Sequence, residues 1–137
     1  MRVFEAEALT GISDVCLRQS RHQEAIGHIQ AALAIHQQTG NRSGESGALN
    51  CLGDVLFRTG EISKARAHHA TAFRLASEVG SPLEQARAHS GLARTYLADG
   101  DSLQARHHWQ EALTCYTTIG APEADDIRAC LASRSFQ

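Results

Sequence analysis

The residues best suited to chemistry in this sequence are its eight histidines, several of which are adjacent or regularly spaced. The adjacent pairs are His68-His69 and His107-His108, and His28, His68 and His108 are spaced forty residues apart. Neighbouring side chains on a helix point about 100° apart, and packed helices lie about 8–10 Å from one another. Zinc needs bonds near 2 Å, so neither pattern makes a chelate. We therefore expect no metal site.

Signs of catalysis are also missing from the sequence. It has no nucleophile-elbow motif, no glycine-rich phosphate loop and no histidine–carboxylate pattern at metal-ligand spacing. The four cysteines, which include no C-x-x-C pair, are Cys16, Cys51, Cys115 and Cys130. This pattern is typical of free thiols in a reducing cytoplasm. We expect no enzyme activity and no bound cofactor, so the chain should act by binding.

One group of polar side chains has the spacing needed to bind a peptide. Asn50, Asp54 and Arg58 are four residues apart, which puts them on one face of a helix. An amide and a carboxylate so placed could bind an extended backbone, and Arg87 and Arg94 could each bind a carboxylate through two hydrogen bonds. The same residues also suit a solvated helix face on which charges pair with one another. Both interpretations remain open from these residues alone.

The chain that carries these side chains repeats every forty residues without gaps. Matching positions hold Ile12, Leu52 and Leu92; Ala25, Ala65 and Ala105; Ala32, Ala72 and Ala112; and Gly40, Gly80 and Gly120. A period of this length, with apolar residues at helical spacing inside it, predicts a stacked helical array. We expect one all-α domain over residues 1–137: three antiparallel helix pairs at about 3–40, 43–80 and 83–120, and a capping helix at about 123–134.

Local signals predict where these helices begin and end. Helices at about 22–39 and 62–79 should stop at Gly40 and Gly80 in the left-handed conformation, and the second repeat should begin after the polar stretch 41–44. Ser81 followed by Pro82 and Glu84 predicts a capping box at the start of the third repeat.

Two repeat positions predict how the helices pack. Ala65 and Ala105 should lie where helices cross most closely, because this position is alanine in all three copies. Another position holds Ile29, His69 and Trp109, where a large side chain would wedge between helices. We expect His69 to be partly buried there.

The repeat resembles the tetratricopeptide repeat. Leu52, Gly53 and Leu56 give its large, small and bulky residues, and Ala65 and Ala72 follow thirteen and twenty residues after the first. Two features depart from the family: the usual tryptophan position holds Leu9, Leu49 and His89, and the repeat has forty rather than thirty-four residues. The resemblance implies a right-handed helical superhelix whose function is protein–protein interaction.

In the tetratricopeptide repeat family, which this sequence resembles, the first helix of each pair lines a concave groove that binds a protein or peptide. Transferred position by position, the binding residues would be Asp14, Arg18, Asn50, Asp54, Phe57, Arg58, Arg87 and Arg94. The family's clamp for C-terminal carboxylates uses lysines and asparagines at set positions, which are mostly not lysine here, so we do not expect binding of chaperone tails.

The third repeat and the ending IGAPEADDIRACL resemble the C-terminal repeats of actinobacterial transcriptional regulators of the antibiotic-regulatory and nucleotide-switch types. This resemblance implies the sensing or docking part of a bacterial cytoplasmic regulator. A free-standing adaptor and a self-assembling scaffold are the alternatives. The net charge of −2 gives no basic surface for nucleic acid, and no apolar run approaches the roughly 18 residues of a membrane helix.

The two ends of the chain differ in how they would finish the stack. Arg128 replaces an interior alanine in the expected capping helix, whereas the first repeat keeps interior-type residues. An uncovered end of a helical array exposes apolar surface. We therefore expect either a longer array or self-association through the N-terminal helix, by way of Val3, Phe4, Ala8 and Val15.

Overall fold

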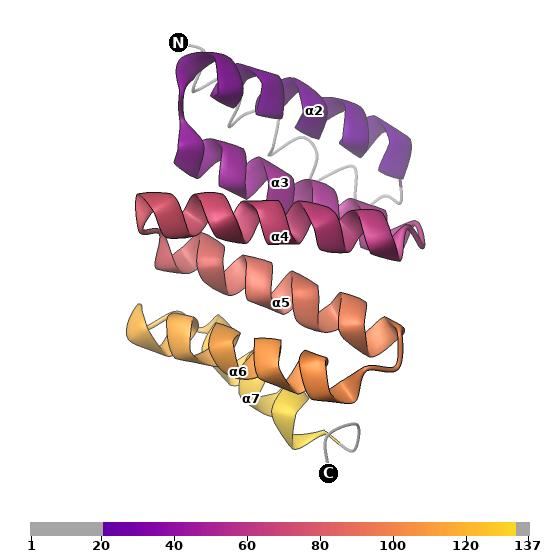
Figure 1. The fold of residues 1–137 in the computed structure, drawn as a ribbon, viewed down its shortest axis with the longest axis vertical. Coiled ribbons are helices and arrows are strands. Elements are labelled where there is room, and N and C mark those ends of the chain that lie inside the picture. The colour runs from indigo at the N-terminus through magenta and orange to yellow at the C-terminus, as the bar shows by residue number, and fades with distance from the viewer. Residues whose placement is uncertain (1–20, 134–137) are drawn as a thin grey trace.

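A computed structural model describes residues 21–133, which form a stack of helices (Figure 1). These are α2 (His22–Thr39), α3 (Arg42–Arg58), α4 (Ile62–Val79), α5 (Pro82–Ala98), α6 (Ser102–Thr118) and α7 (Glu123–Ala132). This part of the chain contains no strand. The expected all-α fold is confirmed, and α2 and α4 have the predicted bounds. The predicted self-association surface, with Val3, Phe4, Ala8 and Val15, lies outside the described residues.

The helix ends follow the sequence signals, with one correction at the start of α3. Gly40 and Gly80 follow α2 and α4 with φ of 68° and 70°, a conformation that glycine adopts without a steric penalty. α3 begins at Arg42, inside the polar stretch 41–44 rather than after it. The reason is that the Asn41 side chain accepts a hydrogen bond from Gly44 N at 3.0 Å and so caps the helix.

The capping box predicted at the start of α5 forms only in part. The Ser81 hydroxyl accepts a hydrogen bond from Glu84 N at 3.4 Å, as expected. The reciprocal half of the prediction is wrong, because Ser81 N donates to the last turn of α4. The Glu84 carboxylate accepts instead from Asn50 and Arg87. Glu84 therefore joins neighbouring repeats rather than capping its own helix.

The arrangement of the helices gives the stack an inner side. Each helix packs against the next along the chain, and α3 also contacts α5 directly. In contrast, no Cα atom of α4 comes within 8 Å of α6. Because α3 and α5 lie closer together than α4 and α6 do, the stack curves, and α3 and α5 lie on its concave side.

The core is built largely from alanine at the repeated positions. Ala25, Ala65 and Ala105 are completely buried, and so are Ala32, Ala72 and Ala112. A methyl side chain lets two helix backbones approach closely, so these positions set the spacing between packed helices.

Leucine in place of Ala65 or Ala105 is expected to overpack the helix crossing and to lower the free energy of unfolding by about 1–3 kcal/mol. Chemical denaturation monitored by helicity measures this change. Ala67→Leu on the exposed face of α4 is the matched control and should leave the midpoint nearly unchanged. Unchanged midpoints for both core variants would show that the repeat register is wrong.

The position shared by Ile29, His69 and Trp109 is filled by a large buried side chain in each repeat, with exposed fractions of 0%, 1% and 5%. His69 is thus fully buried, more than the sequence predicted. At the other end of the stack, α7 covers α6 and buries Ala124 and Ile127. The helix ends two residues before the predicted 134.

Candidate functional site: a groove between α3 and α5

Most of the predicted binding residues lie together on the concave side. α3 carries Asn50, Asp54, Phe57 and Arg58, and α5 carries Arg87 and Arg94. These side chains line two adjoining hollows of about 320 and 270 Å³, which have Asp54 and Arg94 in common. We refer to the two hollows together as the groove. The predicted Asp14 and Arg18 lie outside the described residues.

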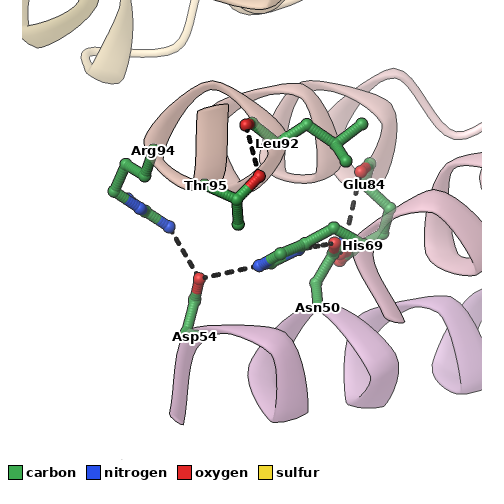
Figure 2. A network of polar contacts seen from close by, with 7 residues as sticks. All are labelled: Asn50, Asp54, His69, Glu84, Leu92, Arg94 and Thr95. Carbon is green, nitrogen blue, oxygen red and sulfur yellow. Dashed lines mark hydrogen bonds and ion pairs between the residues drawn. The ribbon is translucent and has the colours of Figure 1, made fainter. Parts of the chain in front are cut away.

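An ion pair between Asp54 and Arg94 occupies the middle of the groove (Figure 2). Arg94 Nη2 lies 2.6 Å from Asp54 Oδ1, and both side chains remain about 40% exposed. Burial favours a higher pKa for Asp54, but His69, Arg94 and Arg58 together hold that pKa below its usual value. The carboxylate is therefore charged at neutral pH, and it keeps the arginine head at the groove surface.

The groove residues carry one more positive than negative charge. Arg87 Nη1 lies 2.8 Å from Glu84 Oε2, with half of the arginine side chain exposed. Arg58 is exposed at the last turn of α3, next to the half-buried Phe57. Three arginines therefore accompany two carboxylates, Asp54 and Glu84. Part of this charge is paired within the protein, as the solvated-face interpretation predicted, but the arginine heads remain accessible to a partner.

Asn50 has a different role from its neighbours, because it is buried with an exposed fraction of 3%. Its side-chain nitrogen donates to the backbone oxygen and to the carboxylate of Glu84, both at 3.1 Å. Its side-chain oxygen lies 2.9 Å from Nδ1 of His69. Both ends of the amide are thus used inside the protein, and Asn50 joins α3, α4 and α5 (Figure 2).

The Asn50 amide also fixes the hydrogen on His69. Since the amide NH₂ faces the two Glu84 acceptors, the oxygen must face His69, and Nδ1 of the ring is the donor. Nε2 of the ring lies 3.4 Å from Asp54 Oδ1, which is longer than an ordinary hydrogen bond. This contact is an ion pair when Nε2 is also protonated. The buried His69 ring therefore lies directly beside the Asp54 carboxylate.

Two glycines make room for the His69 ring. A Cβ atom built on Gly53 of α3 would lie 2.5 Å from His69 Nε2, and one built on Gly91 of α5 would also overlap the ring. Gly53 was predicted as a small position of the repeat, but the role of Gly91 was missed. The sequence could have indicated this role, because it combines a large polar residue in α4, His69, with a glycine in each of the two flanking helices.

Sequence analysis also missed part of the groove wall. Tyr116 of α6 lines the larger hollow together with Ser90 and Gly47. Tyr116 is 5% exposed, and burial raises the pKa of its hydroxyl. The prediction considered only the first helix of each pair, whereas Tyr116 lies on a second helix. The sequence could have indicated Tyr116 by its size, because the matching position in the preceding repeat holds the much smaller Ala76.

Residues 44–118 match the tetratricopeptide repeat family. This span is more than half of the chain and includes α4, α5, α6 and most of α3. The chain belongs to the tetratricopeptide repeat family. Among solved structures, the tetratricopeptide repeat domain of Arabidopsis FLU is similar, with 19% sequence identity and a TM-score of 0.77. The match covers 86% of this chain and 99% of that domain, and at this identity it shows the shared fold.

Tetratricopeptide repeats are protein–protein interaction modules and generally not enzymes, which agrees with the coarse functional prediction. A comparison with curated proteins found no match. Between residues 21 and 133, no helix is both long enough and apolar enough to span a membrane.

Proposed function

We propose that this tetratricopeptide repeat domain binds a segment of a partner protein in the groove between α3 and α5. The observation that carries the proposal is that residues chosen from the sequence line two adjoining hollows on the concave side. We further propose that the domain is the C-terminal sensing or docking part of a bacterial cytoplasmic transcriptional regulator. The resemblance of the third repeat and of the ending IGAPEADDIRACL supports this role.

The charges of the groove favour a partner segment with carboxylates and one apolar side chain. Arg87 and Arg94 present guanidinium groups that suit carboxylates. Phe57 lines the smaller hollow beside Arg58, where it can pack against an apolar side chain. Because these charges are partly exposed, we expect affinity to fall as the salt concentration rises.

Replacing Arg58 and Arg94 with alanine should weaken partner binding by about tenfold or more, which corresponds to roughly 1.4 kcal/mol. The measurement is the affinity for the native partner, obtained by capture from the source cytoplasm, identification and titration with purified protein. Helicity should remain unchanged, because Arg58 and Arg94 lie on the protein surface rather than in the alanine core. Arg74→Ala on α4 is the matched control, since it removes an exposed arginine outside the groove.

Two outcomes would contradict the groove assignment. One is equal affinity for the wild type and the Arg58→Ala/Arg94→Ala variant. The other is a loss of affinity only when Arg74 or Glu78 is changed. The regulator role is tested separately by the upstream gene region, which should encode a winged-helix or nucleotide-binding domain in the same reading frame.

A further inference from the structure

The groove continues past its two hollows towards the C-terminal end of the stack. A third hollow of about 230 Å³ is lined by residues of α5, α6 and α7, and it shares Ser90, Arg94 and Tyr116 with the larger hollow of the groove. We call it the α7 hollow. α7 packs against α6 (Figure 1), but no Cα atom of α7 comes within 8 Å of α5, whereas α3 and α5 are in direct contact. The wider separation of α5 and α7 therefore leaves room for a side chain next to the groove.

The walls of the α7 hollow are largely apolar. Trp109 of α6 and Ile127 of α7 are buried there, and Cys130 is half-buried three residues after Ile127. Ile127 and Cys130 occupy the repeat positions of Arg87 and Ser90, forty residues earlier. α7 thus lines its hollow with the same repeat positions that α5 places in the groove, but with apolar side chains in place of polar ones. An alkyl chain can pack against these walls.

Two carboxylates border the α7 hollow, and neither forms an ion pair with any residue between 21 and 133. Glu123 is half-buried and Asp126 is exposed, both near the start of α7. Asp125 on the same helix does have a partner, since Arg128 Nη1 lies 2.7 Å from its Oδ1. Arg94 also borders the hollow, but its guanidinium is already paired in the middle of the groove. The unpaired charge of the hollow is therefore negative, whereas the net charge of the groove is positive.

The indole of Trp109 is a second feature that points to a ligand. Its Nε1–H is buried and has no hydrogen-bond acceptor within the described part of the chain. Buried polar groups in folded proteins are nearly always hydrogen-bonded, so an exception needs an explanation. A peptide bound along the hollow can supply an acceptor with a backbone carbonyl oxygen.

We propose that the α7 hollow binds a lysine or arginine side chain of the partner segment that occupies the groove. The alkyl stem packs against Trp109 and Ile127, and the charged head binds Glu123 and Asp126. A carboxylate in the hollow would meet like charges, and an apolar side chain would gain nothing from them. This inference rests on the proposed function of the groove, and it defines the partner further: a carboxylate at Arg94 with a basic side chain beside it.

The test uses n-butylammonium, which has the alkyl stem and the ammonium group of a lysine side chain, with n-butanol as the neutral control. Trp109 is the only tryptophan of the 137-residue chain, so its indole N–H gives a single nuclear magnetic resonance signal. Titration should shift this signal, and n-butylammonium should bind at least about fivefold more tightly than n-butanol. Glu123→Gln combined with Asp126→Asn should remove this preference. Asp125→Asn, on the same helix but outside the hollow, is the matched control and should keep it.

The native partner provides a second measurement. The Glu123→Gln/Asp126→Asn variant should bind it about tenfold more weakly than the wild type, and Asp125→Asn should bind it equally well. If the double variant does not fold, Asp126→Asn alone, at an exposed position, should lower both the partner affinity and the preference for n-butylammonium.

Several results would overturn the proposal. One is equal binding of n-butylammonium and n-butanol to the wild type, and another is an unchanged preference in the carboxylate variants. A third is a partner affinity that falls in the Arg58→Ala/Arg94→Ala variant but not in the carboxylate variants. In that case the groove keeps its proposed function and only the α7 hollow loses its role. If neither set of variants changes the partner affinity, the proposed function of the groove fails as well.

Discussion

Alanine in place of Gly91 is expected to lower the free energy of unfolding by about 3 kcal/mol, the upper part of the range for overpacked cores. A Cβ atom at this position would overlap the Cε1 and Nε2 atoms of the His69 ring. The change adds only one methyl group, so its cost depends on whether the ring can move away.

The surroundings of His69 prevent such a movement. The ring is 1% exposed, and its Nδ1 is hydrogen-bonded to Asn50 at 2.9 Å. A Cβ atom built on Gly53 would also lie within 2.5 Å of the ring, so α3 packs tightly against His69 as well. Moving the ring would break the hydrogen bond or push α3 away from α5. Alanine at Gly91 therefore forces a shift of backbone rather than of a flexible side chain.

Gly27→Ala is the matched control, because it makes the same chemical change but should raise rather than lower the free energy of unfolding. Gly27 lies on the exposed face of α2, and a Cβ atom there would meet no other atom within 4 Å. Alanine favours the helix over glycine by roughly 0.5–1 kcal/mol, so this variant should be more stable than the wild type. Chemical denaturation of both variants gives the comparison.

A double variant separates the steric cause from a general intolerance of substitution at Gly91. With His69 already replaced by alanine, the added methyl group has space, and the further cost of Gly91→Ala should largely disappear. A Gly91→Ala variant as stable as the wild type, or a cost that is the same with and without His69, would contradict the packing described here.

The sequence was sufficient to predict the helices because their determinants are local. The alanines of the forty-residue period mark the buried faces, and glycines such as Gly40 and Gly80 end helices through their own backbone conformation. The residues of the groove could also be predicted, since a repeat places each position on the same face of successive helices. Asp54 and Arg94 occupy the same repeat position, and their opposite charges anticipate the ion pair that joins α3 to α5.

Contacts between residues at different positions of the repeat could not be predicted from the forty-residue period. Glu84 was assigned to a capping box because its spacing from Ser81 is local and familiar. In the structure, the burial of Glu84 against Asn50 determines its partner instead. The contact between His89 of α5 and His108 of α6, whose Nδ1 atoms lie 3.0 Å apart, was missed for a similar reason, because only adjacent histidines and a forty-residue series were considered. Contacts across a helix pair depend on the register between two antiparallel helices, which the repeat alone does not give.

Asn50 and Arg58 were predicted together as binding residues. From the structure we expect opposite effects of replacing them with alanine: a loss of stability for Asn50 and a loss of partner affinity for Arg58. Alanine at Asn50 should lower the free energy of unfolding by about 2–4 kcal/mol, because it leaves Oε1 of Glu84 without its donor and Nδ1 of His69 without its acceptor in a buried site. Each buried polar group left unsatisfied costs about 1–3 kcal/mol. Alanine at Arg58 removes an exposed side chain and should change stability by less than about 0.5 kcal/mol.

The two variants should also differ in how they affect partner binding. At a temperature where Asn50→Ala is fully folded, its affinity for the partner should fall only slightly, because neither end of the Asn50 amide is available to a ligand. Arg58→Ala should lose affinity without losing stability. Denaturation midpoints and titrations on the same samples measure both effects. A stable Asn50→Ala variant with strongly reduced affinity would show that Asn50 is a binding residue and that its contacts with Glu84 and His69 contribute little to the stability of the fold.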